Sequence, residues 1–223
     1  MSTPKPKVTN EETLYLKLKD SIRTGTALPG TRLMEADLVK AYDTSRAVVR
    51  TVLRRLEAEG LVKIDPYKGA RVPALTLEEL VSLLDIREVL EGLAARRASE
   101  RITDEGATEL HDVLARMEAA YKAIDVFEWS DLNAELHLLI TTIAQSERLQ
   151  GIIEAMIVPT VRYAMVSVLT ASRMSKSHAE HCRLVGAICA RDPDAAERAA
   201  REHVATVKRN LLNTDRDRLP MLC

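Results

Sequence analysis

The chain has 223 residues, 46% of them hydrophobic, and a formal net charge of −1, which is typical of a soluble protein with one or two packed domains. It contains no uninterrupted apolar run of about 18 residues and opens with a polar, Pro/Lys-rich stretch, which excludes a predicted membrane span and a secretory signal. Cys182, Cys189 and Cys223 are an odd number without metal-site spacing, which indicates unpaired thiols in a reducing cytoplasm.

Charge is distributed unevenly along the chain. Residues 1–73 carry 14 Lys/Arg against 9 Asp/Glu, a net charge of +5, whereas the remaining residues carry 18 against 24, a net charge of −6. A basic N-terminal part on an acidic body suggests that only the N-terminal part meets a polyanion such as nucleic acid. Chance scatter of surface charge is the alternative interpretation of this observation alone.

The N-terminal part predicts three short helices after an arm at residues 1–10 that is expected to be disordered. The first helix covers Glu11–Arg23, the second covers about Glu35–Tyr42, and the third begins after Ser45. Arg32 and Leu33 form a short extended piece between the first two helices.

The third predicted helix has an apolar face and a basic face. Its apolar residues follow the i, i+3, i+4, i+7 spacing of a buried helical stripe, and they are Val49, Val52, Leu53 and Leu56. Arg46, Arg50 and Arg54 recur every four residues on a different face. Two short helices joined by a tight turn, with arginines on the second, predict a helix-turn-helix whose second member enters the DNA major groove.

After Gly60 the pattern changes from helical to extended. Residues 61–64 and 70–72 read as short strands, and residues 65–69 between them are turn formers. A β-hairpin next to a helix-turn-helix is a wing. Its tip carries Lys68 and Gly69, which can reach the phosphates or the minor groove.

Residues 28–72, LPGTRLMEADLVKAYDTSRAVVRTVLRRLEAEGLVKIDPYKGARV, resemble the winged-helix domain of GntR-type bacterial transcription regulators in turn, recognition helix and wing. The resemblance implies that Arg46 and Arg50 contact guanines, and that Ser45 and Gly69 touch the DNA backbone or groove. A bidentate arginine to guanine is worth about 1–3 kcal/mol of discrimination. Ala36 departs from the family pattern, since many members have an arginine there.

Every predicted element after residue 73 is a helix. The expected ranges are about 76–101, 104–124, 126–144, 147–171, 175–190 and 193–213. Pro159 should kink or split the fourth of these helices. The predicted fold is therefore mainly α, with an N-terminal winged helix-turn-helix followed by an antiparallel all-α bundle of six or seven helices.

Three of the five histidines, His137, His181 and His203, lie in line with apolar residues of their predicted helices, so their imidazoles should point into the bundle. A single histidine so placed is more often a hydrogen-bonded core residue than a metal ligand. Three on separate helices favour a shared site, because buried imidazoles are costly unless something satisfies them.

The helical part of the chain after residue 73, here called the body, contains four short motifs. They are RxxLE at Arg87–Glu91, NAELH at Asn133–His137, EH at Glu180–His181 and REH at Arg201–His203. In these motifs the body is similar to the FCD ligand-binding domain of the FadR branch of GntR regulators. With the winged helix, the resemblance covers roughly residues 11–213.

The resemblance implies that Asn133, His137, His181 and His203 hold a divalent metal inside the bundle, with zinc first and nickel or manganese as alternatives. Asn133 is a departure, because aspartate is common at this position. A neutral amide and three neutral imidazoles leave the two charges of the ion uncompensated, which suggests a small organic acid as effector at the open positions of the ion. Glu135 and Glu180 are expected to point away from the histidine stripes.

Arg87 and Arg162, together with Tyr163, are candidates to bind the effector carboxylate, because a guanidinium matches a carboxylate bidentately. For the arginines, a surface or interhelical ion pair is the alternative.

The sequence therefore predicts an arm at 1–10, a DNA-binding domain at 11–73, a helical effector-binding, metal-binding and dimerisation domain at 74–213, and a tail at 214–223. The predicted function is that of a ligand-responsive, cytoplasmic transcription regulator that binds a palindromic double-stranded DNA operator as a homodimer. Two alternatives stay open: a metal-dependent hydrolase-like enzyme, although no HExxH-type motif is present, and a regulator whose metal is purely structural.

Overall fold

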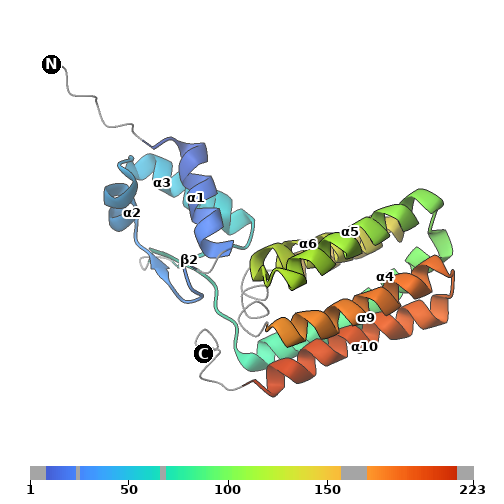
Figure 1. The fold of residues 1–223 in the computed structure, drawn as a ribbon. Coiled ribbons are helices and arrows are strands. Elements are labelled where there is room, and N and C mark those ends of the chain that lie inside the picture. The colour runs from blue at the N-terminus through green and yellow to red at the C-terminus, as the bar shows by residue number, and fades with distance from the viewer. Residues whose placement is uncertain (1–8, 24–25, 66–68, 157–169, 215–223) are drawn as a thin grey trace. The chain divides into compact units, whose positions relative to one another are not determined.

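The computed structural model describes residues 9–23, 26–65, 69–156 and 170–214. The chain divides into two compact units, with the boundary between Thr76 and Leu77. Figure 1 shows short helices and a small sheet in the N-terminal unit and long helices in the C-terminal unit. The predicted site residues Lys68, Arg162 and Tyr163, and the predicted kink at Pro159, lie outside the described residues.

The N-terminal unit contains three helices and a three-stranded antiparallel sheet among its described residues. The helices are α1 (Glu11–Arg23), α2 (Glu35–Tyr42) and α3 (Arg46–Ala58), and the strands are β1 (Arg32–Leu33), β2 (Lys63–Asp65) and β3 (Gly69–Arg71). The strand order is β1-β3-β2, and Ala70 of β3 lies opposite Leu33 on one side and Ile64 on the other. The predicted winged helix-turn-helix is confirmed, and the extended piece at Arg32–Leu33 supplies the third strand.

Helix α3 is fixed at both ends and along its apolar face. The Ser45 side chain accepts a hydrogen bond from the Val48 backbone N–H at 3.2 Å, as expected for an N-cap residue. Gly60, with φ of +70°, follows the helix in a left-handed conformation that glycine adopts without strain. The stripe at Val49, Val52, Leu53 and Leu56 is buried in the core of the unit. The arginine face is therefore left for contact outside the unit.

The C-terminal unit contains six helices among its described residues. They are α4 (Leu77–Arg101), α5 (Asp104–Lys122), α6 (Val126–Ile143), α7 (Glu147–Met156), α9 (Ala171–Cys189) and α10 (Pro193–Leu212). Four of them begin at a capping side chain that accepts a backbone hydrogen bond, and these caps are Thr103, Asp125, Thr170 and Asp192. Pro193 occupies the first turn of α10, where its missing N–H costs nothing.

The helices of this unit pack as a bundle around one main core. Helix α10 packs against α4 and α9, and α5 packs against α6 and α9 (Figure 1). The core is built from aliphatic side chains such as Leu110, Leu136, Leu184 and Ile188. Among the described residues, no helix combines the length and apolarity needed to cross a membrane.

Two predicted helix boundaries were wrong. Helix α9 begins at Ala171 rather than near Ser175, because Thr170 caps its first turn through the Arg173 N–H at 3.2 Å. Helix α5 ends at Lys122, and Ile124 adopts a left-handed φ of 58°. A β-branched residue rarely takes this conformation, so the sequence pattern favoured a longer helix.

Candidate functional site

The basic face of α3 presents two arginines near the N-terminus of the helix. Arg46 and Arg50 are both exposed. The Arg50 Nε donates to Oε1 of Glu35 at 2.9 Å, in an ion pair open to solvent. Exposed pairs contribute little net free energy, so Glu35 can orient the guanidinium and still release it to an outside acceptor. Ala36, the departure noted in the sequence, follows Glu35 directly on α2.

The second strand of the wing begins at a glycine with a positive φ. Gly69 has φ of +82°, and a Cβ added there would lie 3.4 Å from the Met34 Sδ. This conformation favours glycine. The backbone conformation of β3 thus accounts for a glycine here, and the contact of Gly69 with DNA stays a prediction.

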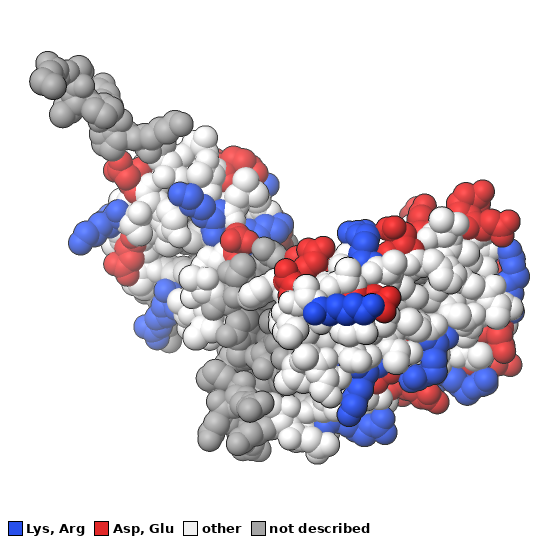
Figure 2. Space-filling view, viewed as in Figure 1, with Lys and Arg blue, Asp and Glu red and all other residues white. Residues whose placement is uncertain are grey.

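Surface charge does not form a single basic patch on the face seen in Figure 2. Lys and Arg side chains stand beside Asp and Glu side chains on the visible face of both units. On this face, recognition of a polyanion by the N-terminal unit would therefore depend on individually placed arginines more than on a uniformly basic surface.

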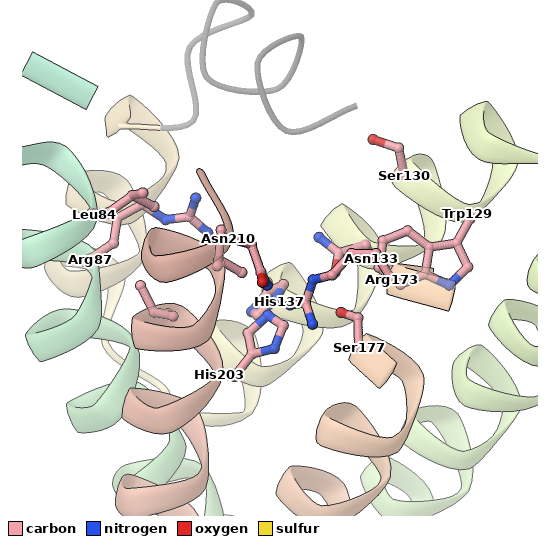
Figure 3. Close-up of a pocket in the computed structure, with 12 residues that line it drawn as sticks. Leu84, Arg87, Trp129, Ser130, Asn133, His137, Arg173, Ser177, His203 and Asn210 are labelled. Carbon is pink, nitrogen blue, oxygen red and sulfur yellow. The ribbon is translucent and has the colours of Figure 1, made fainter. Parts of the chain in front are cut away.

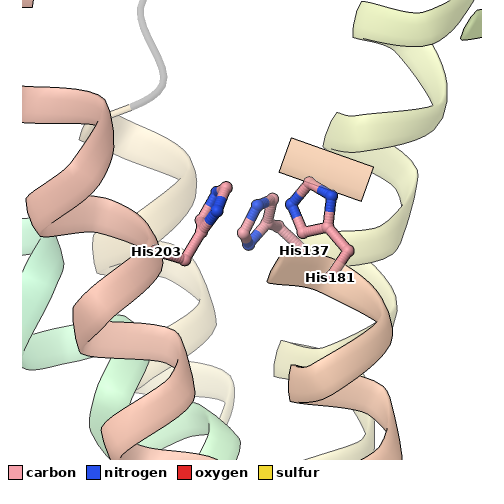
Figure 4. Close-up of side chains that lie close together, drawn as sticks. All are labelled: His137, His181 and His203. Carbon is pink, nitrogen blue, oxygen red and sulfur yellow. The ribbon is translucent and has the colours of Figure 1, made fainter. Parts of the chain in front are cut away.

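The second site lies inside the C-terminal unit, where three histidines converge. His137 on α6, His181 on α9 and His203 on α10 are buried, and each offers a ring nitrogen within 4.8 Å of those of the other two. The ring centroids lie 5.4 Å apart for His137 and His181, 5.5 Å for His137 and His203, and 4.4 Å for His181 and His203. Figure 4 shows the three rings side by side between their helices. The sequence prediction that these histidines meet is confirmed.

The chemistry of this cluster fits a metal ion. Both ring nitrogens of His181 are buried and have no hydrogen-bond partner among the described residues. An imidazole without a partner in a protein interior is costly, and a divalent cation would satisfy one of its nitrogens. Three imidazoles are a typical ligand set for zinc and neighbouring metals.

Two carboxylates touch the cluster from outside. Oε2 of Glu91 on α4 lies 3.1 Å from Nδ1 of His137, and Oε2 of Glu180 on α9 lies 2.8 Å from Nδ1 of His203. The prediction that Glu180 points away from the histidine stripes was therefore wrong. Glu180 leaves the stripe of its own helix, but that direction leads to the neighbouring α10. Glu135, in contrast, is exposed and pairs with Arg116, as expected.

An arginine holds each of these carboxylates. Arg87 donates from Nε to Oε1 of Glu91 at 2.8 Å, and Arg173 donates from Nη1 to Oε1 of Glu180 at 3.1 Å. The sequence argument missed Arg173. Its signal was the seven-residue spacing from Glu180, which places both residues on one face of α9 two turns apart.

The environment controls the charge of these groups. Burial lowers the pKa of His181 well below its ordinary value, with further lowering by His203 and His137. Burial also lowers the pKa of His203, although the hydrogen bond to Glu180 opposes this. Both rings are thus held in the neutral form that can bind a metal.

The carboxylates, in contrast, are held in the charged form. Burial alone would raise the pKa of Glu91, but Arg87 and His137 outweigh it and hold the pKa well below the ordinary value. Burial would likewise raise the pKa of Glu180, but the hydrogen bonds from His203 and Arg173 lower it to about 2.

A cavity of about 80 Å³ opens beside the histidines. Arg87, Asn133, His137, Arg173 and His203 are among its lining residues, and Figure 3 shows them directed toward a common space. They come from α4, α6, α9 and α10. The predicted effector residue Arg87 therefore reaches the cavity, although its guanidinium is paired with Glu91. Asn133 lines the same space as two of the histidines.

In comparison with known proteins, each of the two units matches a different family model. Residues 10–72 match the family described as bacterial regulatory proteins, gntR family, and residues 82–206 match the FCD domain. The HTH-type transcriptional repressor RspR of Escherichia coli is 27% identical over 200 residues, which span 89% of this chain and 87% of that protein. The HTH-type transcriptional repressor GlaR of the same species is 28% identical over 202 residues, which span 86% and 91%.

Solved structures show the same fold. Escherichia coli McbR/YncC has a TM-score of 0.74 at 22% identity, over 92% of this chain and 98% of that chain. A putative GntR transcriptional regulator from a Rhodococcus species has a TM-score of 0.76 at 21% identity, again over 92% and 98%.

Proposed function

The chain belongs to the GntR family of bacterial transcription regulators, in the branch with an FCD domain, and from this premise we propose that it is a metal-dependent sensor of a small carboxylate. In this proposal a homodimer binds a palindromic operator through its winged helices, and the effector binds beside a divalent metal in the helical unit. The observation that carries the proposal is the buried cluster of His137, His181 and His203 beside a cavity lined by arginines.

DNA reading is assigned to the arginine face of α3. Arg46 and Arg50 are exposed near the helix N-terminus, which is the end that reaches base edges in helix-turn-helix proteins. Ser45 and Gly69, together with Lys68 at the predicted wing tip, are assigned to the DNA backbone or groove. Phosphate contacts position the protein without reading sequence, whereas arginine contacts to guanine specify it.

A homodimer is proposed because one winged helix with two reading arginines would discriminate weakly among genomic sites. Helix α4 carries an exposed apolar stripe at Ile86, Val89 and Leu93, which are 49%, 54% and 37% exposed. The i, i+3, i+7 spacing puts the three side chains on one face. We assign this face to the contact with a second copy.

Sensing is assigned to the cavity beside the histidines. Asn133, His137, His181 and His203 would hold the metal, which would supply a positive charge and open positions for an anionic ligand. The cavity has a volume of about 80 Å³, several times the roughly 10–15 Å³ needed to hold one water, so it has room for a small ligand. Arg87 and Arg173 supply guanidinium groups on the cavity wall, and Arg162 and Tyr163 stay candidates for the same role.

The DNA part of the proposal is tested with operators selected from a random pool by the full-length protein. Arg46→Ala and Arg50→Ala should lose preference for the selected sequences over random DNA. Lys68→Ala should weaken binding to all sequences by a similar factor and reduce the salt dependence. Uniform losses in all three variants would contradict the assigned roles.

The sensing part is tested by metal analysis of the purified protein, followed by titration with a panel of small mono-, di- and tricarboxylates before and after chelation. Binding of a carboxylate should require the metal, and His203→Ala should abolish both metal binding and carboxylate binding. Carboxylate affinity that is unchanged after chelation would contradict metal-mediated sensing and would favour a purely structural metal. The relatives are named as transcriptional regulators, and none of these observations favours the hydrolase alternative.

A further inference from the structure

Two Arg–Glu–His chains run toward the histidine cluster. In the first, Arg87 binds Oε1 of Glu91 at 2.8 Å, and Oε2 of the same carboxylate lies 3.1 Å from Nδ1 of His137. This chain connects α4 to α6. Glu91 is 5% exposed, and each of its two carboxylate oxygens has a partner inside the protein.

The second chain connects α9 to α10. Arg173 contacts both oxygens of Glu180 at 3.1 and 3.2 Å, and Oε2 lies 2.8 Å from Nδ1 of His203. The side chains of Arg173 and Glu180 are each 12% exposed. The two chains thus share the order of groups, the histidine atom that they contact and nearly complete burial.

The contact with Nδ1 decides what the other ring nitrogen can do. A charged carboxylate only accepts hydrogen bonds, so Nδ1 must carry a proton to donate one. In a neutral imidazole the remaining nitrogen, Nε2, then has no proton and exposes its lone pair. A carboxylate oxygen faces Nδ1 of both His137 and His203, so in its neutral form each ring leaves Nε2 for the cluster.

His181 provides an internal contrast. Neither of its ring nitrogens has a partner among the described residues, although its neighbour Glu180 lies one residue away in the chain. The carboxylate of Glu180 turns to His203 on the adjacent helix instead. The tautomer of His181 is therefore not fixed by any described hydrogen bond, whereas a carboxylate oxygen faces Nδ1 of each of the other two rings.

We propose that Glu91 and Glu180 are positioning residues of the metal centre, each of which fixes the tautomer and orientation of one ligand histidine so that Nε2 faces the ion. This inference rests on the proposed metal site. The arginines complete the assignment, because Arg87 and Arg173 hold the carboxylates from the far side and keep their oxygens directed at Nδ1. Partners of this kind typically contribute 10–100-fold to metal affinity.

An ion pair that serves stability alone would not need this geometry. Arg87 and Glu91 are an i, i+4 pair on one helix, and such a pair is complete without a histidine. The Oε2 atom of Glu91 nevertheless contacts a histidine ring on another helix, and Oε2 of Glu180 likewise contacts a ring on the neighbouring helix. Two independent chains that select Nδ1, and leave Nε2 in both cases, indicate a function for the free nitrogen.

The first test reads the tautomers directly in full-length, metal-free protein. Long-range proton–nitrogen spectra of ¹⁵N-histidine-labelled protein should show the Nδ1–H form for His137 and His203 at neutral pH, with assignment by single His→Gln variants. His181 should not show this fixed Nδ1–H form. An Nε2–H form at His137 or His203 would overturn the inference, because the nitrogen left for the ion would then be protonated.

The second test measures zinc affinity by competition with a chromophoric chelator. Glu91→Gln and Glu180→Gln preserve side-chain volume but remove the charge, and each should weaken zinc binding by about 10–100-fold. Glu135→Gln is the matched control, since Glu135 lies two residues before His137 but is exposed and pairs with Arg116. It should bind zinc as the unaltered chain does. Circular dichroism of each variant without metal verifies that the helical unit is folded.

The outcomes separate this inference from the proposed function. If the unaltered chain binds zinc and both glutamine variants bind it equally well, the metal site stands and the positioning role is wrong. If the unaltered chain binds no zinc, nickel or manganese, the metal site itself is wrong and the positioning role falls with it. If a glutamine variant does not fold, the tautomer measurement on the unaltered chain still decides the question.

Discussion

Replacing His181 with leucine should stabilise the metal-free protein and abolish its response to metal. His181 is completely buried, and neither ring nitrogen has a hydrogen-bond partner among the described residues. A buried polar group without a partner costs about 1–3 kcal/mol. Leucine has a similar volume and no polar atom, and the neighbouring Trp129 ring, 6.0 Å away between centroids, gives it an apolar contact.

The expected gain in metal-free protein is about 2 kcal/mol, the middle of that range. For a chain of this size it corresponds to a rise in Tm of about 4–8 °C. Zinc at about 100 times its Kd would stabilise the unaltered chain by about 2.7 kcal/mol through binding to the folded state alone. When zinc is added, the stability advantage of His181→Leu over the unaltered chain should therefore shrink or reverse, because the variant has lost a metal ligand.

The assay is thermal unfolding followed by circular dichroism at 222 nm, in chelator and again in excess zinc. His111→Leu is the control, because His111 is exposed on α5 and its Nδ1 contacts the Ala107 carbonyl oxygen of its own helix. Its effect should stay within about 0.5 kcal/mol in both conditions. A His181→Leu protein that is less stable than the unaltered chain in chelator would refute the reasoning, since it would mean that the imidazole is satisfied without metal.

Three further predictions concern the rest of the molecule. Ile124→Gly should stabilise by about 1 kcal/mol in thermal unfolding, because Ile124 is exposed and its φ of 58° favours glycine. Burial raises the pKa of Glu59, but hydrogen bonds from Lys19 and Tyr15 outweigh it and lower the pKa. The stabilisation by Glu59 should thus be present at pH values above the pKa of an unfolded glutamate, about 4.3, and be lost as the pH falls through the lower pKa of the folded state. Glu59→Gln should therefore weaken the dependence of stability on pH in this acidic range. Val89→Glu should shift sedimentation from dimer to monomer and weaken operator binding, whereas an unchanged dimer would exclude the α4 stripe from the interface.

The sequence predicted most of the fold because local signals agreed with one another. The stripe from Val49 to Leu56, the Ser45 cap and Gly60 all indicate the same helix, and the structure places α3 at Arg46–Ala58. The start of α9 was missed because two signals competed. Residues before Ser175 continue an apolar pattern, but the Thr170 cap begins a new helix.

The histidine cluster could be predicted because each ring lies on the apolar stripe of its own helix. The carboxylates that contact it could not be predicted in the same way. Glu180 lies about 100° around α9 from His181, and periodicity within one helix shows only that it leaves that stripe. Its contact with His203 depends on how α9 and α10 pack, which is information between helices that a single sequence pattern does not carry.

The corrected position of Glu180 leaves the charge argument about Asn133 intact. Glu91 and Glu180 are matched by Arg87 and Arg173, so each pair is neutral as a whole. Neutral imidazoles and the amide of Asn133 add no charge, and a divalent ion at the proposed site would keep an excess of two positive charges. An anionic ligand is then favoured, and a dianion more than a monoanion.

Asn133→Asp tests this argument, because it adds one negative charge at the cavity wall without a change of shape. A charge-assisted contact is worth about 1.5–3 kcal/mol, so the variant should bind zinc about tenfold or more tightly. The same charge should repel the effector, and the affinity for any dicarboxylate that the unaltered chain binds should fall by a larger factor than the affinity for a monocarboxylate. Calorimetric titration of zinc, then of each acid into the zinc-loaded protein, measures both effects. Zinc binding that strengthens while dicarboxylate binding stays the same would show that the effector does not lie close to the charge at this position.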